Sequence, residues 1–416
     1  MIQRIFHPVG QGAFYSERHE NYNIVYDCGC MSVSKGKKVV SQSFNKEDVI
    51  DILFISHFDY DHVSLIEHLK KSVKKIRLVV MPLLYDDEKI LLCNIFKALE
   101  KDALVTLVEN PKEFFGAETH IIRVKPSSEE EINSKEETDK DTPSLSISLN
   151  NINKDLEEIS SGTLIAIEEN SDWVFIPFNY EYKDRNKEFL DKLESDEIDK
   201  LKSSKHIFDS EFRNKIKMVY KKINGNINEN SMFLYSGPYP KEKNSPKEKN
   251  SPKEENSLKE ENSPNYKGLD WTFKYLDESS FKYFLDTPSS SLSECSFSGP
   301  YKNPFLKNFL PCLYRVACLY TGDGDLNKVD VKNIYEEKWD LIGTIQIPHH
   351  GSLKSFKKSI LEDRYFLCPI SVGKKNPYGH PSREVVRKIL SNTSFPIFVT
   401  EDVDSEFTET IEKINN

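Results

Sequence analysis

The 416-residue sequence has no long hydrophobic run, because no stretch approaches eighteen consecutive apolar residues. A helix that crosses a bilayer needs about 20 such residues, so we predict no membrane-spanning segment and no membrane partner. The first residues, M-I-Q-R-I-F-H-P-V-G-Q-G, also lack the charged-then-apolar pattern of a secretory signal. We therefore expect a cytoplasmic protein.

Cysteine is scarce as well, with seven residues in the whole chain. So few cysteines in a chain of this length do not form a disulfide framework, which agrees with a reducing compartment. Cys28 and Cys30 form a C-x-C pair that could bind a metal ion. We interpret them instead as small buried residues at the end of a strand.

An excess of positive charge is also missing. The 57 Lys and Arg residues are outnumbered by 67 Asp and Glu residues, which gives a net charge of −10. This balance argues against a protein coated in positive charge for nucleic acid, although it permits a locally basic site. The length fits one large domain with insertions or two domains.

What the sequence does contain is a dense cluster of metal-ligand side chains at 56–65, S-H-F-D-Y-D-H-V-S-L. Four ligand-type residues fall within six positions: His57, Asp59, Asp61 and His62. An apolar run at 52–55 predicts a buried strand before them, and apolar residues spaced four apart at 65–73 predict a helix after them. Imidazole and carboxylate groups on such a turn suit zinc, manganese or iron. The alternative is a polar loop without a ligand role.

Similar side chains follow predicted strands in the C-terminal part of the chain. The run 316–320 leads into T-G-D-G-D at 321–325, and the run 341–347 ends in P-H-H-G-S at 348–352. A further run at 366–372 leads into G-K-K-N-P-Y-G-H-P at 373–381. These segments supply four more candidates: Asp323, His349, His350 and His380. Residues so far apart in sequence meet only in a fold that returns to one edge.

The pattern H-x-D-x-D-H at 57–62 resembles the H-x-H-x-D-H signature of the metallo-β-lactamase superfamily, with Asp59 in place of the second histidine. This variant, with V-Y-D-C-G at 25–29 and N-E-N-S-M-F-L-Y at 228–235, resembles the hydrolase domain of the competence DNA-uptake (ComEC-type) family. The resemblance implies an α/β fold of the αββα sandwich type, with two β-sheets face to face and helices outside. We expect a single such domain over 1–416.

The resemblance also implies two divalent ions, zinc or manganese, at one rim of the sandwich. One ion is assigned to Asp61, His62 and His349. The other is assigned to His57 and Asp59, with Asp323 as the bridging ligand. The third histidine motif of the superfamily is missing, which leaves a more oxygen-rich site.

The candidates for catalysis are Asp61, His350 and His380. We expect His350 to point towards the substrate or to support the ligands, and His380 to be a proton donor or a substrate contact. A structural role for His380 in its Pro/Gly turn is an equal alternative. In the family, the aspartate that matches Asp27 braces the metal loops from behind.

The middle of the chain is less informative. A helical pattern predicts an insertion at 183–225, with Phe212, Ile216 and Val219 on one face. The insertion is a simple addition to the core, a cap that selects the substrate, or a surface that docks a protein partner. Residues 241–264 repeat a K-E-K-N-S-P-like unit with almost nothing apolar, which predicts a disordered loop.

Two groups of basic residues accompany the motifs, one at 70–77 and the other at 354–388. If they form a basic rim around the metals, the substrate is a phosphodiester, and the family resemblance points to DNA. The leading hypothesis is a metal-dependent phosphodiesterase that acts as a nuclease. The alternatives are a hydrolase of a small phosphoester or cyclic nucleotide, and a metal-depleted scaffold that docks a partner.

Overall fold

The computed structural model describes residues 1–127, 144–146, 155–167, 172–180, 187–203, 209–222, 231–239, 271–276, 315–362 and 364–413. The strands of these residues form two β-sheets, which are joined where the end of β6 (His120–Ser127) pairs with the end of β10 (Trp173–Tyr180). The predicted loop at 241–264 lies outside the described residues. None of the described helices is long and apolar enough to cross a bilayer.

The first sheet has an antiparallel half and a parallel half. Its strand order is β12 (Trp271–Leu276), β17 (Phe407–Lys413), β1 (Ile2–Phe6), β2 (Phe14–Arg18), β3 (Asn23–Cys28), β4 (Val49–Phe54), β5 (Lys75–Pro82), β6 and β8 (Glu158–Ser160). The pairs from β12 to β3 are antiparallel, and those from β3 to β8 are parallel. The loops that follow β3, β4 and β5 therefore leave the same edge of the sheet.

The second sheet repeats this division. Its strand order is β7 (Ser144–Ser146), β9 (Leu164–Ala166), β10, β11 (Met232–Pro238), β13 (Ala317–Tyr320), β14 (Ile342–Ile345), β15 (Leu367–Ser371) and β16 (Phe395–Val399). The strands β9 and β10 pair antiparallel. The strands β13 to β16 are parallel, so their following loops also share one edge.

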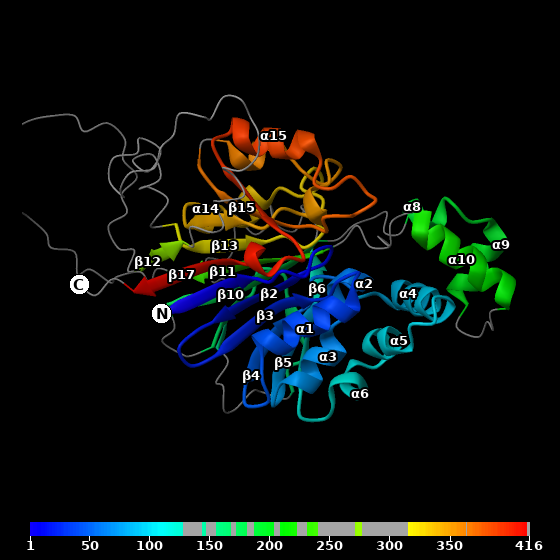
Figure 1. The fold of residues 1–416 in the computed structure, drawn as a ribbon. Coiled ribbons are helices and arrows are strands. Elements are labelled where there is room, and N and C mark those ends of the chain that lie inside the picture. The colour runs from blue at the N-terminus through cyan, green and yellow to red at the C-terminus, as the bar shows by residue number, and fades with distance from the viewer. Residues whose placement is uncertain are drawn as a thin grey trace, which may run out of the picture.

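Helices cover the outer faces of the two sheets (Figure 1). The first sheet is covered by α1 (Val33–Ser43), α2 (Tyr60–Val63), α3 (Ile66–Ser72), α4 (Asp86–Ala98), α5 (Asp102–Glu109) and α6 (Pro111–Phe115). The second is covered by α13 (Val331–Ile334), α14 (Glu336–Trp339) and α15 (Arg383–Ser391), with short 3-10 turns η2 (His349–Gly351), η3 (Lys358–Leu361) and η4 (Val403–Ser405) nearby in sequence.

Three apolar layers hold these elements together. The middle layer lies between the sheets and contains Phe54 and Leu78 from the first sheet with Phe175 and Leu234 from the second. One outer layer packs helices on the first sheet, and the other packs helices on the second. Strands such as β5 are buried on both faces, which explains their continuous apolar sequences. The predicted αββα sandwich is confirmed.

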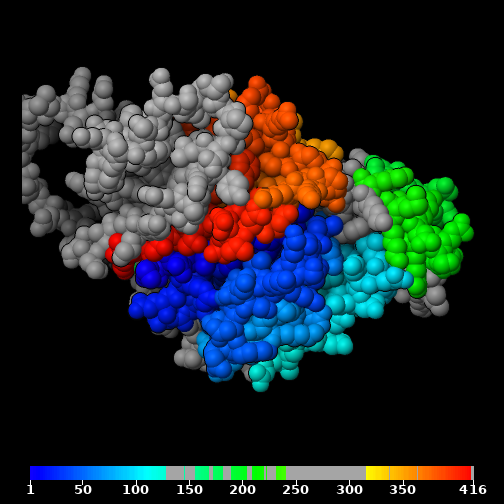
Figure 2. Space-filling model, viewed as in Figure 1, coloured from blue at the N-terminus to red at the C-terminus, as the bar shows by residue number. Residues whose placement is uncertain are grey.

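Three helices extend the helical layer of the first sheet: α8 (Lys187–Leu190), α9 (Ser195–Lys202) and α10 (Ser210–Lys222). The Asn94 side chain of α4 donates hydrogen bonds to the carbonyls of Leu201 and Ser203, at 2.7 and 2.9 Å. Figure 2 shows the three helices as a lobe that projects beyond α4. The hypotheses that they cap the active site or dock a partner stay predictions.

Candidate metal centre

The candidate ligands meet at the edge where the parallel strands of both sheets end. The segment after β4 carries His57 to His62, and the segments after β13, β14 and β15 carry the C-terminal motifs. Because β11 runs antiparallel to β13, its start brings Ser231 to the same edge. Two hydrogen bonds of 2.8 Å join the sheets here: Met232 N–H donates to the Ser56 carbonyl, and the Tyr26 hydroxyl donates to the Met232 carbonyl.

His57, His62 and Asp323 form a first group of side chains that could hold a metal ion, each offering one ligand atom within 4.8 Å of the others. His62 Nε2 lies 3.1 Å from Asp323 Oδ1, and His57 Nε2 lies 3.9 Å from Asp323 Oδ2. The Asp59 carboxylate lies 3.7 Å from His57 Nε2. Four of the six predicted ligands therefore converge from two distant parts of the sequence.

Asp27 fixes the orientation of this group from behind, as the sequence predicts. Its Oδ2 lies 2.8 Å from His62 Nδ1 and accepts the Ser56 hydroxyl at 2.6 Å, while its Oδ1 accepts the Ser56 N–H at 2.7 Å. A carboxylate only accepts, so His62 Nδ1 carries a proton, and Nε2 is the ring atom left to bind a metal ion. This tautomer is the one that a histidine ligand requires.

His57 receives a comparable orientation from two serines. Its Nδ1 lies 2.8 Å from Ser56 Oγ and 3.0 Å from Ser231 Oγ. The Ser56 hydroxyl already donates to Asp27, so it accepts the proton of His57 Nδ1. Ser231 Oγ also accepts the backbone N–H of Asp323 at 2.8 Å. Sequence reasoning missed Ser231, although the N-E-N-S-M segment around it was the available signal.

Asp61, His62 and His350 form a second group of possible ligands. His350 Nε2 lies 3.0 Å from Asp61 Oδ2, and its Nδ1 donates to the Ser371 carbonyl at 2.8 Å. The backbone carbonyl fixes the tautomer, so Nε2 faces Asp61. His350, predicted to point towards the substrate or to support the ligands, therefore lies against the predicted ligand Asp61.

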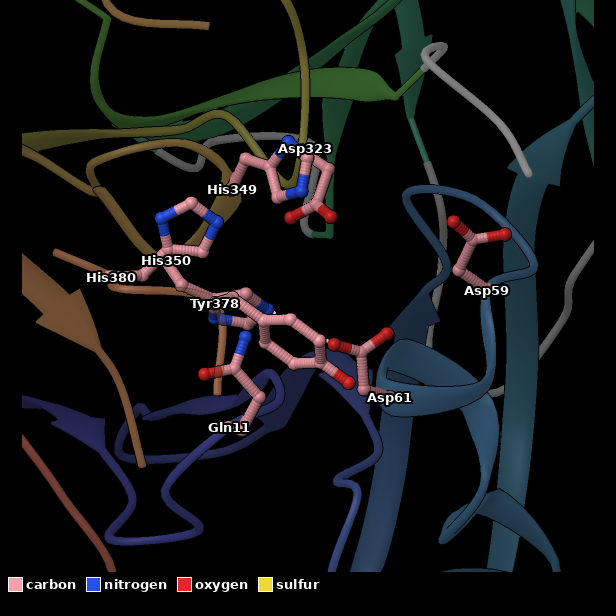
Figure 3. A pocket seen from close by; sticks show the side chains of 8 residues that line it. All are labelled: Gln11, Asp59, Asp61, Asp323, His349, His350, Tyr378 and His380. Atoms are coloured by element: carbon pink, nitrogen blue, oxygen red, sulfur yellow. Dashed lines mark hydrogen bonds and ion pairs between the residues drawn. The ribbon is translucent and has the colours of Figure 1, made fainter. Parts of the chain in front are cut away.

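The assignment of His349 as a ligand stays a prediction. It belongs to neither of the two groups found among the described residues, but its ring lies beside Asp323 (Figure 3), and its charge lowers the pKa of that carboxyl. Its Nδ1 lies 3.3 Å from Ser355 Oγ, and the side chain lines the pocket beside the ligands. Both His349 and His350 have positive φ values, 49° and 53°. The chain therefore turns at each residue, and the second histidine is the one that faces Asp61.

The turn that carries Asp323 is held by Gln346, another residue that sequence reasoning missed. Gln346 Oε1 accepts the N–H groups of Thr321 and Gly322 at 2.9 and 2.8 Å. Gly322 has a φ of 53°, and a Cβ atom there would lie 2.8 Å from Ser231 Oγ. The glycine of T-G-D-G is thus required both by the backbone angle and by the close approach of β11.

Burial and the neighbouring charges set the protonation of the first group. Burial, reinforced by His62, lowers the pKa of His57 to about 3. Burial would also lower the pKa of His62, but the carboxylates of Asp323 and Asp27 raise it well above its usual value. Burial would raise the pKa of Asp323, whereas His62 and His349 hold it well below its usual value. In the metal-free protein His62 therefore carries the positive charge of this group, and His57 stays neutral.

These residues fit a divalent cation. The Nε2 atoms of His57 and His62 are buried and make no hydrogen bond with the described residues, although they face carboxylates. Buried polar atoms are normally hydrogen-bonded, and an imidazole nitrogen turned towards carboxylates is an arrangement that a metal ion satisfies. The mixture of imidazole and carboxylate donors is compatible with zinc or manganese.

A pocket opens over the ligands (Figure 3). It is lined by Gln11, Asp59, Asp61, Asp323, His349, His350, Tyr378 and His380. Burial, with the charges of His349 and His350, lowers the pKa of His380 to about 4. His380 is therefore a neutral imidazole at neutral pH, and its role as a proton donor or a substrate contact stays a prediction. Sequence reasoning missed Gln11 and Tyr378, of which the first lies in the glycine-flanked H-P-V-G-Q-G segment.

The two predicted basic groups differ in position. The group at 70–77 does not form part of the predicted basic rim. Lys75 pairs with Val49 at the start of β4, whereas the ligands follow the end of that strand. Arg77 there contacts Asp51 at 3.0 Å. In the second group, Lys354 follows the turn that carries His349 and His350, and its charge contributes to the lowered pKa of His380.

No protein-family model and no curated protein sequence matches the chain. Among solved structures, human tRNase Z, short form (ELAC1), is similar over 57% of this chain and 64% of its own, with 10% identity and a TM-score of 0.25. The metallo-beta-lactamase fold protein YhfI from Bacillus subtilis is similar over 43% of this chain and 54% of its own, with 10% identity and a TM-score of 0.18. Both matches span less than two thirds of the solved chains. At these TM-scores the fold rests on the sheets and helices described above.

Proposed function

We propose that the protein is a metal-dependent phosphodiesterase that uses two divalent ions, zinc or manganese. The observation that carries this proposal is the meeting of His57, His62 and Asp323 with Asp61 and His350 at one edge of the sandwich. When bound at such a site, divalent ions lower the pKa of a coordinated water and polarise a phosphoryl group.

Each candidate side chain would have its own role in this reaction. Asp323 lies next to the His57 and His62 rings, so its carboxylate is the candidate for a ligand shared between ions. Asp61 and His350 complete the second group. His380, neutral at neutral pH, would accept a proton or donate its N–H to the substrate.

A polymeric substrate, and so a nuclease acting on DNA, is supported by the basic residues beside the pocket. Lys354 lies close enough to influence His380, and Lys357 and Lys358 follow in the same loop with exposed side chains. Each phosphate that a lysine neutralises releases counterions, which strengthens the binding of a long polyanion.

A small phosphoester or cyclic nucleotide is the second candidate, and the ion pairs of other basic residues favour it. Lys374 contacts Asp402, while Arg387 and Lys388 contact Glu384. These cations are partly neutralised within the protein, so the basic surface at 354–388 is smaller than the sequence predicts. The metal-depleted scaffold loses support, because the candidate ligands converge.

The decisive experiment is a hydrolysis screen of single- and double-stranded DNA, RNA, cyclic nucleotides and a chromogenic phosphodiester with Mn²⁺ or Zn²⁺. The pair Asp323→Asn and Asp325→Asn provides the matched control, since Asp325 is one glycine away and accepts hydrogen bonds from Asn327. We expect Asp323→Asn to abolish turnover and Asp325→Asn to retain it. Absence of turnover on every phosphodiester with either metal would overturn the proposal.

A further inference from the structure

The candidate site has two halves, one at the edge of each sheet. Asp61 and His62 follow β4 of the first sheet, whereas Asp323 and His350 follow β13 and β14 of the second. The two halves form one site only if contacts between the sheets fix their relative position. Some of these contacts come from side chains in the layer between the sheets.

Three stacked tyrosines belong to this layer: Tyr15 of β2, Tyr26 of β3 and Tyr320 of β13. The ring centroids of Tyr26 and Tyr320 are 4.8 Å apart, and those of Tyr15 and Tyr320 are 5.9 Å apart. All three side chains are buried. A buried phenol normally finds a hydrogen-bond partner, and the partners of Tyr15 and Tyr26 belong to the opposite sheet.

Tyr15 reaches the end of β15. Its hydroxyl lies 3.0 Å from Ser371 Oγ. The carbonyl of Ser371 accepts the His350 Nδ1–H at 2.8 Å, and Nε2 of the same ring lies 3.0 Å from Asp61 Oδ2. Asp61 is in turn tied to the segment before β2, because its carbonyl accepts the Ala13 N–H at 3.1 Å, two residues before Tyr15. A closed chain of contacts therefore links Tyr15 to the direction of the His350 ring.

Tyr26 supports the other group of possible ligands. Its hydroxyl donates to the Met232 carbonyl at 2.8 Å. The preceding residue, Ser231, contacts His57 Nδ1 and accepts the Asp323 N–H. The two phenols thus lead to different groups of ligands, although they belong to one stack of rings.

We propose that Tyr15 is a positioning residue for His350, and so for the second group of possible ligands. The inference rests on the proposed function, which places a metal ion at this group. Burial raises the pKa of Tyr15, so the phenol stays neutral and acts by its hydrogen bond rather than by charge. Without that bond Ser371 loses its link to the first sheet, and the carbonyl that orients His350 is no longer tied to the half of the site that carries Asp61.

The test titrates the metal-free protein with Mn²⁺ or Zn²⁺ in a calorimeter and compares Tyr15→Phe with the wild type. Phenylalanine keeps the ring and removes only the hydroxyl. We expect the affinity for one of the two ions to fall about tenfold, which is the lower end of the range for partners of a histidine ligand. The affinity for the other ion should stay unchanged.

Tyr235→Phe is the matched control. Tyr235 is also buried, and its hydroxyl donates to the carbonyl of Pro238 at the end of its own strand, at 2.8 Å. The control therefore loses one hydrogen bond of a buried phenol without losing a link between the sheets, and it should bind both ions like the wild type. Equal losses of affinity in the two variants would overturn the inference.

Ser371→Ala shows whether Tyr15 acts through Ser371. Alanine removes the hydroxyl and keeps the backbone carbonyl that His350 uses. Since the two hydroxyls form one contact, Tyr15→Phe should cause no further loss of affinity in the Ser371→Ala background. Additive losses would mean that Tyr15 acts by another route and would overturn the inference.

A second measurement needs no bound metal. In metal-free protein labelled with ¹⁵N-histidine, the proton on His350 Nδ1 should give an NMR signal that is protected from exchange. The signal should be lost or broadened in Tyr15→Phe and retained in Tyr235→Phe. An unchanged signal in Tyr15→Phe would overturn the inference, as would an unchanged affinity for both ions. Failure of the proposed function looks different: the wild type then binds no metal or hydrolyses no phosphodiester, while the His350 signal still depends on Tyr15.

Discussion

His57 and His62 take their orientation from one buried carboxylate, that of Asp27. The contact with His62 is direct, and the contact with His57 passes through the Ser56 hydroxyl. Hydrogen bonds of this kind fix the tautomer of a histidine ligand and the direction of its ring. Asp27 also has a φ of 53°, so the backbone itself is turned to bring the carboxylate behind both rings.

Replacement of Asp27 by asparagine should therefore weaken metal binding about 10–100-fold, as is typical when a histidine ligand loses its hydrogen-bonded carboxylate. Asparagine tolerates the positive φ, so the backbone should be preserved. The measurement is a titration of the metal-free protein with Mn²⁺ or Zn²⁺. Asp51→Asn is the control, because Asp51 is also buried but contacts Arg77 towards the other end of β4. Equal metal affinity in both variants would contradict the role of Asp27.

The affinity for metal should rise with pH. In the metal-free protein the pKa of His62 is raised by Asp323 and Asp27 against the effect of burial, and that of His350 is raised by Asp61 in the same way. An ion must displace these protons, so affinity should increase from about pH 6 to about pH 8. Calorimetry in buffers of different ionisation enthalpy should detect the released protons. A pH-independent affinity without proton release would contradict the assignment.

The raised pKa values of His62 and His350 have the opposite effect on the stability of the metal-free protein, which should fall as pH rises. A raised pKa in the folded state contributes stability below the unfolded value of about 6.5, and this contribution is lost as pH rises through the folded pKa. The stabilisation of the protein by metal, measured as the difference between the two melting temperatures, should therefore be larger at higher pH.

For single residues, the sequence predicted which motif residues are candidate ligands but did not predict the directions of their side chains. His57, Asp61, His62 and Asp323 were predicted because their types and spacing are chemically distinctive. The contact of His350 with Asp61 was not predicted, because two consecutive left-handed residues set the directions of the His349 and His350 rings. Ser231, Gln346 and Tyr378 are common residue types with no distinctive spacing, so only the fold reveals their contacts.

Strand direction decides which basic residues can serve the site. Lys75 and Arg77 lie at the start of β5 or near it, whereas Lys354, Lys357 and Lys358 follow the loop that carries His350. A run of lysines looks the same in sequence at either end of a strand. The structure thus separates a basic group beside the pocket from one at the opposite edge of the sheet.

Charge reversal at Lys354, Lys357 and Lys358 should strongly weaken cleavage of long DNA and leave a small chromogenic phosphodiester almost unaffected. The small substrate makes no contact with a surface outside the pocket, and the polymer contribution depends on salt. Charge reversal at the exposed Lys71, Lys74 and Lys75 provides the control, with little effect expected on either substrate. Equal losses on both substrates in the first variant would assign its lysines to the fold or to the site itself.

Secondary structure was predicted best where strands are buried on both faces. The predicted apolar runs that correspond to β4, β13 and β15 show no alternation of apolar and polar residues that would obscure them. The helix α1 was missed because only Gly36 and Val40 are buried in it. Two buried residues are too few to produce a helical periodicity of apolar residues in the sequence. The strand β2 was missed as well, since its F-Y-S-E-R sequence includes Glu17, which is buried only because Arg4 accompanies it.

That ion pair belongs to a polar network in the core of the whole molecule. Arg4 contacts Glu17 at 2.8 Å and Glu409 at 2.5 Å, and all three side chains are buried. The Tyr320 hydroxyl of the second sheet donates to Glu17 at 3.0 Å, and the Thr344 hydroxyl donates to Glu409. The network therefore ties the two sheets together through charges that water does not screen.

Replacement of Arg4 by methionine should destabilise the protein by about 3–5 kcal/mol, because two buried carboxylates lose their cation. Chemical denaturation gives the free energy of unfolding, and Lys413→Met serves as the control. Lys413 pairs with Asp172 at the surface, with more than half of its side chain exposed, so its loss should cost at most about 1 kcal/mol. Similar losses in both variants would mean that the buried network adds no particular stability.

We propose that the two sheets bring the two motif regions together into one site for two divalent ions. Elemental analysis of the purified protein, after reconstitution with Mn²⁺ or Zn²⁺, tests it most directly. We predict close to two ions per chain in the wild type and in Asp325→Asn, and the loss of at least one ion in Asp323→Asn. A wild-type protein that retains no transition metal after reconstitution, or an Asp323→Asn variant that retains as much as the wild type, would contradict the account.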